Sequence, residues 1–553
     1  MLSHSLLQQR AFALDRSQLR LPPQLETIGE SAKVKTLPLE VVEGRVYKYA
    51  PPGSAVLSLP FVAIAGWLRV KPVDSEGLYS ARRELLLSAT LAALLMAIFV
   101  VACFHFANLV LPLSWSLAVA IFAAFGTQVW STASRVLEPD TWTILLIFSA
   151  VVLLLASELG DTRLRPVLLA SLLASSYFVH PTTAIPIAGI TGFLAIYRRK
   201  EFLPFAFTGA FWLLLFVVFS WLTFGQVLPN YYQPGRLGFQ TFVEALPGNL
   251  ISPSRGLLVY IPLLAAIGFL LLRYRRVVPH KRLVTLSLII LTAHWLMISG
   301  FEHWWAGHSY GPRYWTSMVP WFVLLGVLSA RGLLNQQPDP LRRSWKVKTG
   351  VLVLASLSVF IHARGALSEE TRLWNARPFD IDLRAGRLWD WSYPQFLAGL
   401  IDPPLPPDAY AEPALNQKLD MTSPVMGQFL WYGWSDAEPE IRWTEARRAA
   451  LVFALTKPLD LKLVLKAQPF LAGGLLDSQR VVVRLNGAEI QSLTLTSATD
   501  SELTITLAVA NLKRDNVIVF DFPDAQSPDK FGLSADRRLL GLAVQWIEFR
   551  TGS

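Results

Sequence analysis

Residues able to do chemistry are densest between Phe301 and Trp315, where the sequence reads FEHWWAGHSYGPRYW. This stretch holds two His, one Glu, one Arg, two Tyr and three Trp, and it lies between the apolar runs 283–298 and 318–328. Ionisable side chains are costly at membrane depth, so a dense group of them at the mouth of a helix indicates a functional site. We therefore take this stretch as the centre of the predicted site.

Arg313, in the sequence GPRY, is the strongest single candidate. An arginine at the start of an apolar run requires an anionic partner, either from the protein or from a ligand. The neighbouring His303, His308 and Tyr310 are assigned to the same substrate-binding site. His303, His308 and Glu302 are also residue types that bind metals, but their spacing matches no specific ligand motif. We therefore predict no metal residues and no certain cofactor, and a divalent metal stays an open alternative.

Three other polar segments interrupt the apolar runs and supply further candidates. The segment STASRVLEPD contains Arg135, Glu138 and Asp140. Pro139 and Asp140 suit a helix start, because proline is tolerated in the first turn and a carboxylate complements the helix dipole. Arg135 and Glu138 are not needed for such a start. A helix-capping role for Asp140 and a catalytic role for Glu138 and Asp140 therefore both stay open.

The other two segments are SYFVHPTTA, with His180, and SPSRG, with Arg255. His180 stands alone between apolar runs, so a structural histidine at a helix break is the preferred interpretation, with substrate binding as the alternative. A guanidinium at a helix start can hold a phosphate by two parallel hydrogen bonds. We assign Arg255 to that role, beside the alternative of a plain interfacial arginine.

The composition indicates an integral membrane protein. Of the 553 residues, 53% are hydrophobic, which exceeds the share of about 45–50% that is typical of soluble domains. The net charge of +10 does not indicate nucleic-acid binding, because the Lys and Arg residues lie mostly in short loops between apolar runs. The single cysteine, Cys103, lies inside an apolar run, which excludes a disulfide framework and a thiolate metal site.

Ten apolar segments approach the length that a bilayer requires. They lie near 85–106, 114–130, 141–158, 166–179, 183–197, 203–224, 257–272, 283–300, 314–330 and 347–363. One alternate set of the connecting loops holds fifteen Lys and Arg residues, and the other set holds only Arg135, Arg236, Arg255 and Arg313. Since Lys and Arg are enriched on the cytoplasmic side, the second set of loops is predicted to lie outside.

These features predict a multi-span α-helical membrane domain followed by an extracytoplasmic all-β sandwich. The expected regions are a first extracytoplasmic loop with interfacial helices at 1–83, the membrane domain at 84–364, an extracytoplasmic linker region at 365–412 and the sandwich at 413–553. The first loop opens with an amphipathic segment, and its apolar run at 55–68 is too short to cross a bilayer.

The sandwich is predicted from alternating apolar and polar residues. Leu461, Leu463 and Leu465 alternate with lysines, and similar alternation recurs near 493–496 and 503–507. The Asn486-Gly487 pair suits a two-residue hairpin turn. Several such strands indicate a β-sandwich.

The three outward-facing arginines suit a lipid phosphate. A phosphate leaving group develops negative charge, and preorganised arginine side chains stabilise that charge. A carboxylate in the same place can remove the proton of an attacking hydroxyl. The polar segments therefore favour a group transfer from a phosphorylated lipid.

Four segments carry a family resemblance. GRVYKYAPPGSAVLSLPF, FGTQVWSTASRVLEPD, ISPSRGLLVYIPLL and HWWAGHSYGPRYW, in this order, resemble the large bacterial membrane glycosyltransferases of the GT-C fold. The wider group includes lipid A aminoarabinose transferases and protein O-mannosyltransferases. The resemblance covers residues 1–400. The segment WYGWSDAEPEIRWTE and the strands after it are similar to carbohydrate-binding-like β-sandwiches of bacterial polysaccharide membrane proteins.

The resemblance implies an inverting hexosyl or pentosyl transferase of the bacterial inner membrane. Such an enzyme moves a sugar from a polyprenyl-phosphate carrier to an extracytoplasmic glycan, lipid or protein acceptor, with no nucleic acid involved. The carrier phosphate would be held by Arg255, Arg313 and Arg135. Glu138 or Asp140 would serve as a secondary acid, base or metal ligand.

The family's general base is usually an acid just after the first span. The resemblance places that span and that acid before Met1, so the chain begins late or is a weakened relative. A first-loop acid is the alternative base, with Asp15, Glu40 and Glu43 as the candidates. The rival to the transferase is a non-catalytic membrane protein of polysaccharide assembly or export, whose sandwich binds carbohydrate.

Overall fold

The computed structural model describes residues 2–14, 39–42, 44–73, 79–160, 162–336, 345–377, 380–382, 384–401, 403–404, 410–534, 536 and 538–551. The chain forms two compact units, Met1–Ile401 and Asp402–Ser553. The first is mainly helical and the second is built of β-strands. The boundary falls inside the region predicted as a linker, 365–412, so most of that region belongs to the helical unit.

Each of the ten predicted apolar segments contains a helix. Six helical segments among the described residues are long and apolar enough to cross a membrane, and four more are apolar but shorter. The long helices are α4 (Ala81–Asn108), α6 (Pro139–Leu159), α9 (Arg199–Phe224), α13 (Lys281–Ser299), α14 (Val319–Asn335, extended by η6, Arg313–Met318) and α16 (Trp345–Leu367). The shorter helices are α5 (Leu113–Phe125), α7 (Pro166–Val179), α8 (Ala184–Tyr197) and α12 (Leu263–Arg273). The predicted helical class of this region is therefore confirmed, and six of its helical segments are candidate membrane spans. The number of ten crossings stays a prediction.

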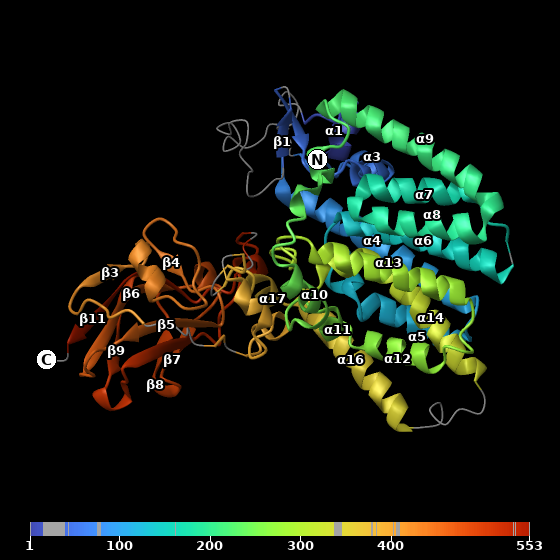
Figure 1. Ribbon diagram of the computed structural model, residues 1–553. Helices are drawn as coiled ribbons and strands as arrows, with labels where there is room; N and C mark the ends of the chain where they lie inside the picture. Colours follow the sequence, from blue (N-terminus) through green and yellow to red (C-terminus); the bar gives the residue numbers. More distant parts are fainter. Residues whose placement is uncertain are drawn as a thin grey trace. The chain divides into compact units, whose positions relative to one another are not determined.

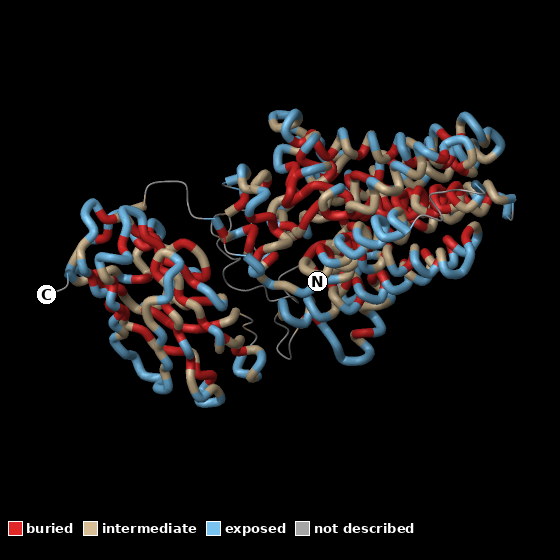
Figure 2. Tube along the Cα trace, turned by 90° about the horizontal axis from the view of Figure 1, so that it is seen from below, coloured by how far each residue is buried: buried red, intermediate tan, exposed pale blue. Residues whose placement is uncertain are grey.

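The helices lie side by side around α14. Helix α6 packs against α4, α7 and α14, and α13 packs against α8 and α14 (Figure 1). Buried residues run along the interior of this bundle (Figure 2). Helix α9 lies at its edge and exposes large apolar side chains such as Phe207 and Leu222. Exposed apolar surface on a long helix is typical of a lipid-facing position, because lipid tails are as apolar as those side chains.

Short elements cover the end of the bundle where the predicted polar segments lie. They include η2 (Val129–Ala133, a π-helical turn), η3 (Pro181–Thr183), η4 (Asn230–Tyr232), η5 (Pro234–Arg236), α10 (Phe242–Ile251) and α11 (Leu257–Tyr260). The hydroxyl of Tyr232 donates to the carbonyl oxygen of Phe178, at the C-terminal end of α7. A β-bridge joins Leu237 to Phe301, which follows α13. These contacts bring segments from distant parts of the sequence to one end of the helices.

The first loop packs at the same end. Its described part forms α1 (Leu2–Gln9), the hairpin of β1 (Leu39–Val42) and β2 (Arg45–Lys48), α2 (Gly53–Leu57) and α3 (Leu59–Trp67). Gly53 touches the backbone of Phe178 so closely that a Cβ atom would overlap it. The run 55–68 is helical, as predicted, and it is divided between the short helices α2 and α3. Trp67, at the end of α3, is 83% exposed. An exposed tryptophan suits the interface of a membrane.

Residues 365–401 fold against this end of the bundle as well. They form α17 (Glu369–Leu373), η7 (Ala385–Trp389) and η8 (Gln395–Leu397). Trp374, Leu388 and Tyr393 share a core with Trp304 and Trp305. Burial of several aromatic side chains stabilises this segment, since each removes a large apolar area from water.

The second unit is a β-sandwich of two antiparallel sheets. One sheet has the order β5-β10-β7-β8, and the other has the order β3-β11-β6-β9, with β4 also paired to β11. The strands are β3 (Lys418–Asp420), β4 (Arg442–Trp443), β5 (Arg448–Ala454), β6 (Leu461–Pro469), β7 (Gln479–Leu485), β8 (Ala488–Leu495), β9 (Ser501–Leu507), β10 (Asp515–Asp521) and β11 (Leu542–Thr551). Short 3₁₀ turns lie at η9 (Pro424–Gln428), η10 (Ala472–Gly474), η11 (Val509–Asn511) and η12 (Pro528–Phe531).

The predicted strands and hairpin are confirmed. Leu463 and Leu465 of β6 point into the core between the sheets, together with Phe520 and Phe549. Strands β7 and β8 pair through the Asn486-Gly487 turn, where both residues have positive φ, 51° and 90°. That geometry is typical of a type I′ turn, whose twist matches the twist of the paired strands.

Candidate functional site

The structure joins two of the predicted site residues directly. Nη2 of Arg313 donates to Oε2 of Glu138 at 2.8 Å, and both side chains are about one-third exposed, at 34% and 32%. Asp140, buried in the first turn of α6, lies within electrostatic range of the same guanidinium. The hydroxyls of Tyr231 and Tyr314 also lie within electrostatic range of Arg313. Arg313 therefore stands at the centre of a polar group that faces solvent on one side.

Arg313 retains donors for a ligand. Its guanidinium makes this one side-chain hydrogen bond among the residues that the structure describes. Arg135 is exposed, and it lies between η2 and Glu138 on the segment that carries the ion pair. No hydrogen bond of its guanidinium lies within the described part of the chain. Two guanidinium groups are thus available at this end of the bundle.

Arg255 is arranged differently. It is 1% exposed, and all five of its N–H groups donate to the protein. The acceptors are the carbonyl oxygens of Ser254, Trp305 and Gly307 and the side-chain oxygens of Gln395 and Asn375. Burial lowers the pKa of Arg255 to about 10, so it stays charged at neutral pH. No donor is left for a phosphate, and Arg255 instead ties three segments of the chain together.

Gln395 completes this buried network, which we call the Arg255 network. Its amide nitrogen donates to the carbonyl oxygens of Ser309 and Thr371, and its Oε1 accepts from the backbone N–H of Gly311. The backbone of the 301–315 stretch is therefore hydrogen-bonded to this network at Trp305, Gly307, Ser309 and Gly311.

One of the three first-loop acids lies in the described residues. Glu40, on β1, accepts a hydrogen bond of 3.0 Å from Nδ2 of Asn230, the residue before Tyr231. The rings of Tyr49 and Tyr231 also touch, with centroids 5.6 Å apart. Burial raises the pKa of Glu40 above its ordinary value, and the Asn230 hydrogen bond opposes part of that shift. Glu40 therefore lies beside the segment whose Tyr231 is within electrostatic range of Arg313, whereas Asp15 and Glu43 fall outside the described residues.

His180 and Tyr310 make local structural contacts. His180 ends α7, and its Nδ1 lies 2.5 Å from Oγ1 of Thr182, while its carbonyl oxygen accepts from Thr183. The hydroxyl of Tyr310 donates to the carbonyl oxygen of Ile361 in α16 at 2.6 Å. These contacts agree with the structural interpretation of His180. Substrate binding by His180 or Tyr310 stays a prediction.

The two remaining histidines lie on the exposed side of the 301–315 stretch. His303 packs edge-on against the ring of Trp305, with centroids 4.9 Å apart. His308 contacts Asp380, 72 residues later in the sequence, at 3.0 Å. The structure does not bring either histidine into contact with Arg313. Their assignment to substrate binding stays a prediction.

Several residues of this region carry no signal in the sequence. Asn230, Asn375 and Gln395 are isolated polar residues, and Asp380 and Asp382 lie in a region predicted to be a linker. The aromatic density of 374–393, with three Trp and one Tyr, is the feature that indicates a packed segment there.

Comparisons with known proteins leave the family open. No family model matches the sequence, and no curated protein is similar to it. Among solved structures, a family 35 carbohydrate binding module from an environmental isolate matches 26% of this chain and 92% of its own, at 14% identity and a TM-score of 0.15. Xyl-CBM35 in complex with a glucuronic acid containing disaccharide matches 25% of this chain and 95% of its own, at 11% identity and a TM-score of 0.15.

A third match is a family GH115 4-O-methyl-alpha-glucuronidase, BtGH115A, with specificity for decorated arabinogalactans. It covers 49% of this chain and 32% of its own, at 13% identity and a TM-score of 0.17. Identities and TM-scores this low carry no functional argument. The architecture rests instead on the helices and the two sheets of the chain itself.

Proposed function

We propose that this chain is an inverting glycosyltransferase that takes a sugar from a polyprenyl-phosphate carrier, with Arg313 and Arg135 on the carrier phosphate. The observation that carries the proposal is the Arg313–Glu138 pair at the polar end of an apolar helix bundle. Arg313 is held in place by one acid and keeps its other donors. Guanidinium groups bind phosphate well, because several N–H donors match the phosphate oxygens.

Glu40 is the proposed general base. Its raised pKa and its position beside Asn230 suit a carboxylate that accepts a proton during the reaction. In the transfer, Glu40 takes the proton of the acceptor hydroxyl, and the hydroxyl oxygen forms a bond to the anomeric carbon. The bond from that carbon to the phosphate oxygen breaks on the opposite face, so the configuration inverts. The phosphate leaves with the bonding electrons, and Arg313 stabilises its charge.

Glu138 and Asp140 are assigned positioning roles. Glu138 orients the guanidinium of Arg313, and the buried Asp140 adds negative charge behind it. Arg255 is left out of the phosphate site, because its five donors are already used. The acceptor is proposed to be an envelope glycan, lipid or protein, which the β-sandwich helps to hold.

The direct test is turnover by the full chain in lipid nanodiscs. The protein is incubated with polyprenyl-phosphate-linked hexoses and pentoses and with envelope extracts, and transfer and release of labelled sugar are measured. Glu40→Gln is expected to lower the rate by about 10²–10⁴-fold, the usual share of a general base. Glu302→Gln is the matched control and should keep the rate, because Glu302 is an exposed acid of the 301–315 stretch. Absence of turnover with every donor would favour the non-catalytic assembly protein.

A further inference from the structure

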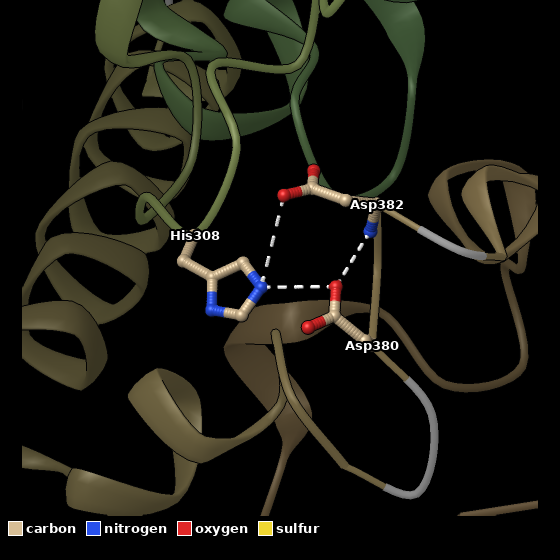
Figure 3. Close-up of side chains that lie close together, drawn as sticks. All are labelled: His308, Asp380 and Asp382. Carbon is tan, nitrogen blue, oxygen red and sulfur yellow. Dashed lines mark hydrogen bonds and ion pairs between the residues drawn. The ribbon is translucent and has the colours of Figure 1, made fainter. Parts of the chain in front are cut away.

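One histidine and two aspartates converge on the exposed side of the 301–315 stretch. Nε2 of His308 lies 3.0 Å from Oδ1 of Asp380 and 3.9 Å from Oδ2 of Asp382 (Figure 3). One ligand atom from each of the three residues can be chosen so that all three lie within 4.8 Å of one another. We propose that these residues form a binding site for one divalent metal ion, Zn²⁺ or Mn²⁺.

The spacing of the three side chains fits a metal ion. Zinc binds histidine nitrogen and carboxylate oxygen at about 2.0–2.2 Å, which places neighbouring ligands of a tetrahedral site about 3.4 Å apart. The two distances from His308 fall on either side of that value. Small side-chain rotations are therefore enough to surround an ion.

Both carboxylates are oriented by further hydrogen bonds. Nε1 of Trp305 donates to Oδ1 of Asp382 at 2.7 Å, which leaves Oδ2 facing His308. The backbone N–H of Asp382 donates to Oδ1 of Asp380 at 2.9 Å. Donors of this kind fix the ligands of metal sites and raise their affinity. Trp305 is itself buried, so its indole N–H is a rigid donor.

The Arg255 network holds the two halves of the site together. Nη2 of Arg255 donates to the carbonyl oxygen of Gly307, the residue before His308, and to Oδ1 of Asn375. The carbonyl oxygen of Asn375 accepts from the N–H of Ile381, between the two aspartates. The segments that carry His308 and the two aspartates are therefore joined through one buried arginine, and the three side chains lie close together without an ion.

The simpler interpretation is an ion pair between a protonated His308 and the aspartates. Arg255 lies within electrostatic range of Asp382, and Arg387 lies within electrostatic range of Asp380. One observation favours the metal site over the simple ion pair. Asp380 and Asp382 both direct an oxygen at the imidazole of His308, and Trp305 fixes the carboxylate of Asp382.

The choice of metal follows from the ligands. Imidazole with carboxylates suits zinc and manganese, whereas copper(I) prefers sulfur ligands. The side chains of His308, Asp380 and Asp382 are 44%, 39% and 42% exposed, so an ion can enter and complete its shell with water. Three protein ligands with an open position are the arrangement in which a metal keeps an exchangeable water.

The test measures metal binding alone and is independent of the transferase proposal. The full chain is stripped with EDTA and titrated with Mn²⁺, followed by electron paramagnetic resonance, and with Zn²⁺, followed by calorimetry. We expect one ion per chain, with affinity lowered at least about tenfold in His308→Ala and Asp380→Asn, and about 10–100-fold in Trp305→Phe, which removes the donor to Asp382.

Glu302→Gln is the control, because it makes the same acid-to-amide change in the stretch that carries His308. It should bind the metal as the parent chain does. Size-exclusion chromatography of each variant shows that it is folded. The proposal is overturned if the stripped parent chain takes up no stoichiometric Mn²⁺ or Zn²⁺, or if folded His308→Ala and Asp380→Asn bind as tightly as Glu302→Gln.

Discussion

Arg313 and Glu138 lie 175 residues apart in the sequence, and their side chains meet at 2.8 Å at the end of the helix bundle. The pair is partly exposed, so it contributes only about 0–1 kcal/mol to stability. The same guanidinium has donors left for a ligand. A contact that adds little to folding and keeps its hydrogen-bonding capacity is suited to binding.

The first prediction separates the contribution of Arg313 to ligand binding from its contribution to stability. Arg313→Ala should weaken the binding of polyprenyl phosphate in nanodiscs about 10–100-fold, because a hydrogen bond to a charged group contributes about 1.5–3 kcal/mol. Its thermal unfolding temperature should stay close to that of the parent chain. Arg313→Lys should restore part of the binding, since it keeps the charge but loses the planar fork. Equal binding by all three proteins would remove Arg313 from the phosphate site.

Substitution of Arg255, unlike that of Arg313, is expected to destabilise the fold. Arg255→Ala should lower the free energy of unfolding by at least about 2 kcal/mol, because each buried acceptor left unpaired costs about 1–3 kcal/mol. Thermal unfolding and the yield of monodisperse protein are the measurements. Arg135→Ala is the matched control, and its change should stay within about 0.5 kcal/mol, because the side chain is exposed. A stable Arg255→Ala chain would contradict a structural role for the network.

Glu40 predicts a pH dependence of activity. A base must be ionised, so the rate should rise with pH through a pKa above the ordinary glutamate value, since burial raises the pKa of Glu40. The pH profile of sugar transfer measures this limb. Glu40→Gln should abolish it, and a profile with a midpoint at the ordinary value would point to another base.

The same raised pKa of Glu40 predicts that the free energy of unfolding falls as the pH rises, whereas the rate of transfer rises. Because the pKa of Glu40 is raised in the folded chain, that chain binds more protons than the unfolded one between the two pKa values. Stability therefore falls as pH rises through this window. Glu40→Gln cannot lose a proton, so above the window its unfolding temperature should equal or exceed that of the parent chain. A large fall in the unfolding temperature would show that Glu40 is structural.

Gly433 and Gly487 of the sandwich both have positive φ but differ in their surroundings. A Cβ atom on Gly433 would overlap the carbonyl oxygen of Arg448, whereas Gly487 has open space around it. Gly487→Ala should cost about 1–2 kcal/mol from backbone strain alone. Gly433→Ala should cost more, because the backbone must also move. Thermal proteolysis of the sandwich in the full chain measures both, and equal effects would contradict the close contact.

Much of the fold could be predicted because it depends on local patterns. Helices recur in all ten apolar segments, and β6, β8 and β9 follow the alternation of their residues. The Asn486-Gly487 hairpin depends on two adjacent residues with positive φ. The common end of the polar segments follows from the up-and-down alternation of the helices.

The roles of individual arginines could not be predicted from these patterns. Arg255 and Arg313 both precede apolar segments, yet one is buried with five acceptors and the other keeps free donors. The acceptors of Arg255 come from segments up to 140 residues away. Asp380 meets His308, 72 residues earlier in the sequence, in a segment that joins the same network through Asn375 and contacts Trp305 through Asp382. Such contacts depend on the tertiary packing of residues that carry no local signal.

The most direct measurement locates the carrier phosphate on the protein. A polyprenyl phosphate with a photoreactive group beside the phosphate is crosslinked to the full chain in nanodiscs, and the labelled peptides are identified by mass spectrometry. The proposed function predicts crosslinks in 129–140, 230–240 and 301–315, and their loss in Arg313→Ala. Crosslinks confined to the basic segments at the opposite helix ends, 197–201 and 273–282, and unaffected by Arg313→Ala, would contradict it.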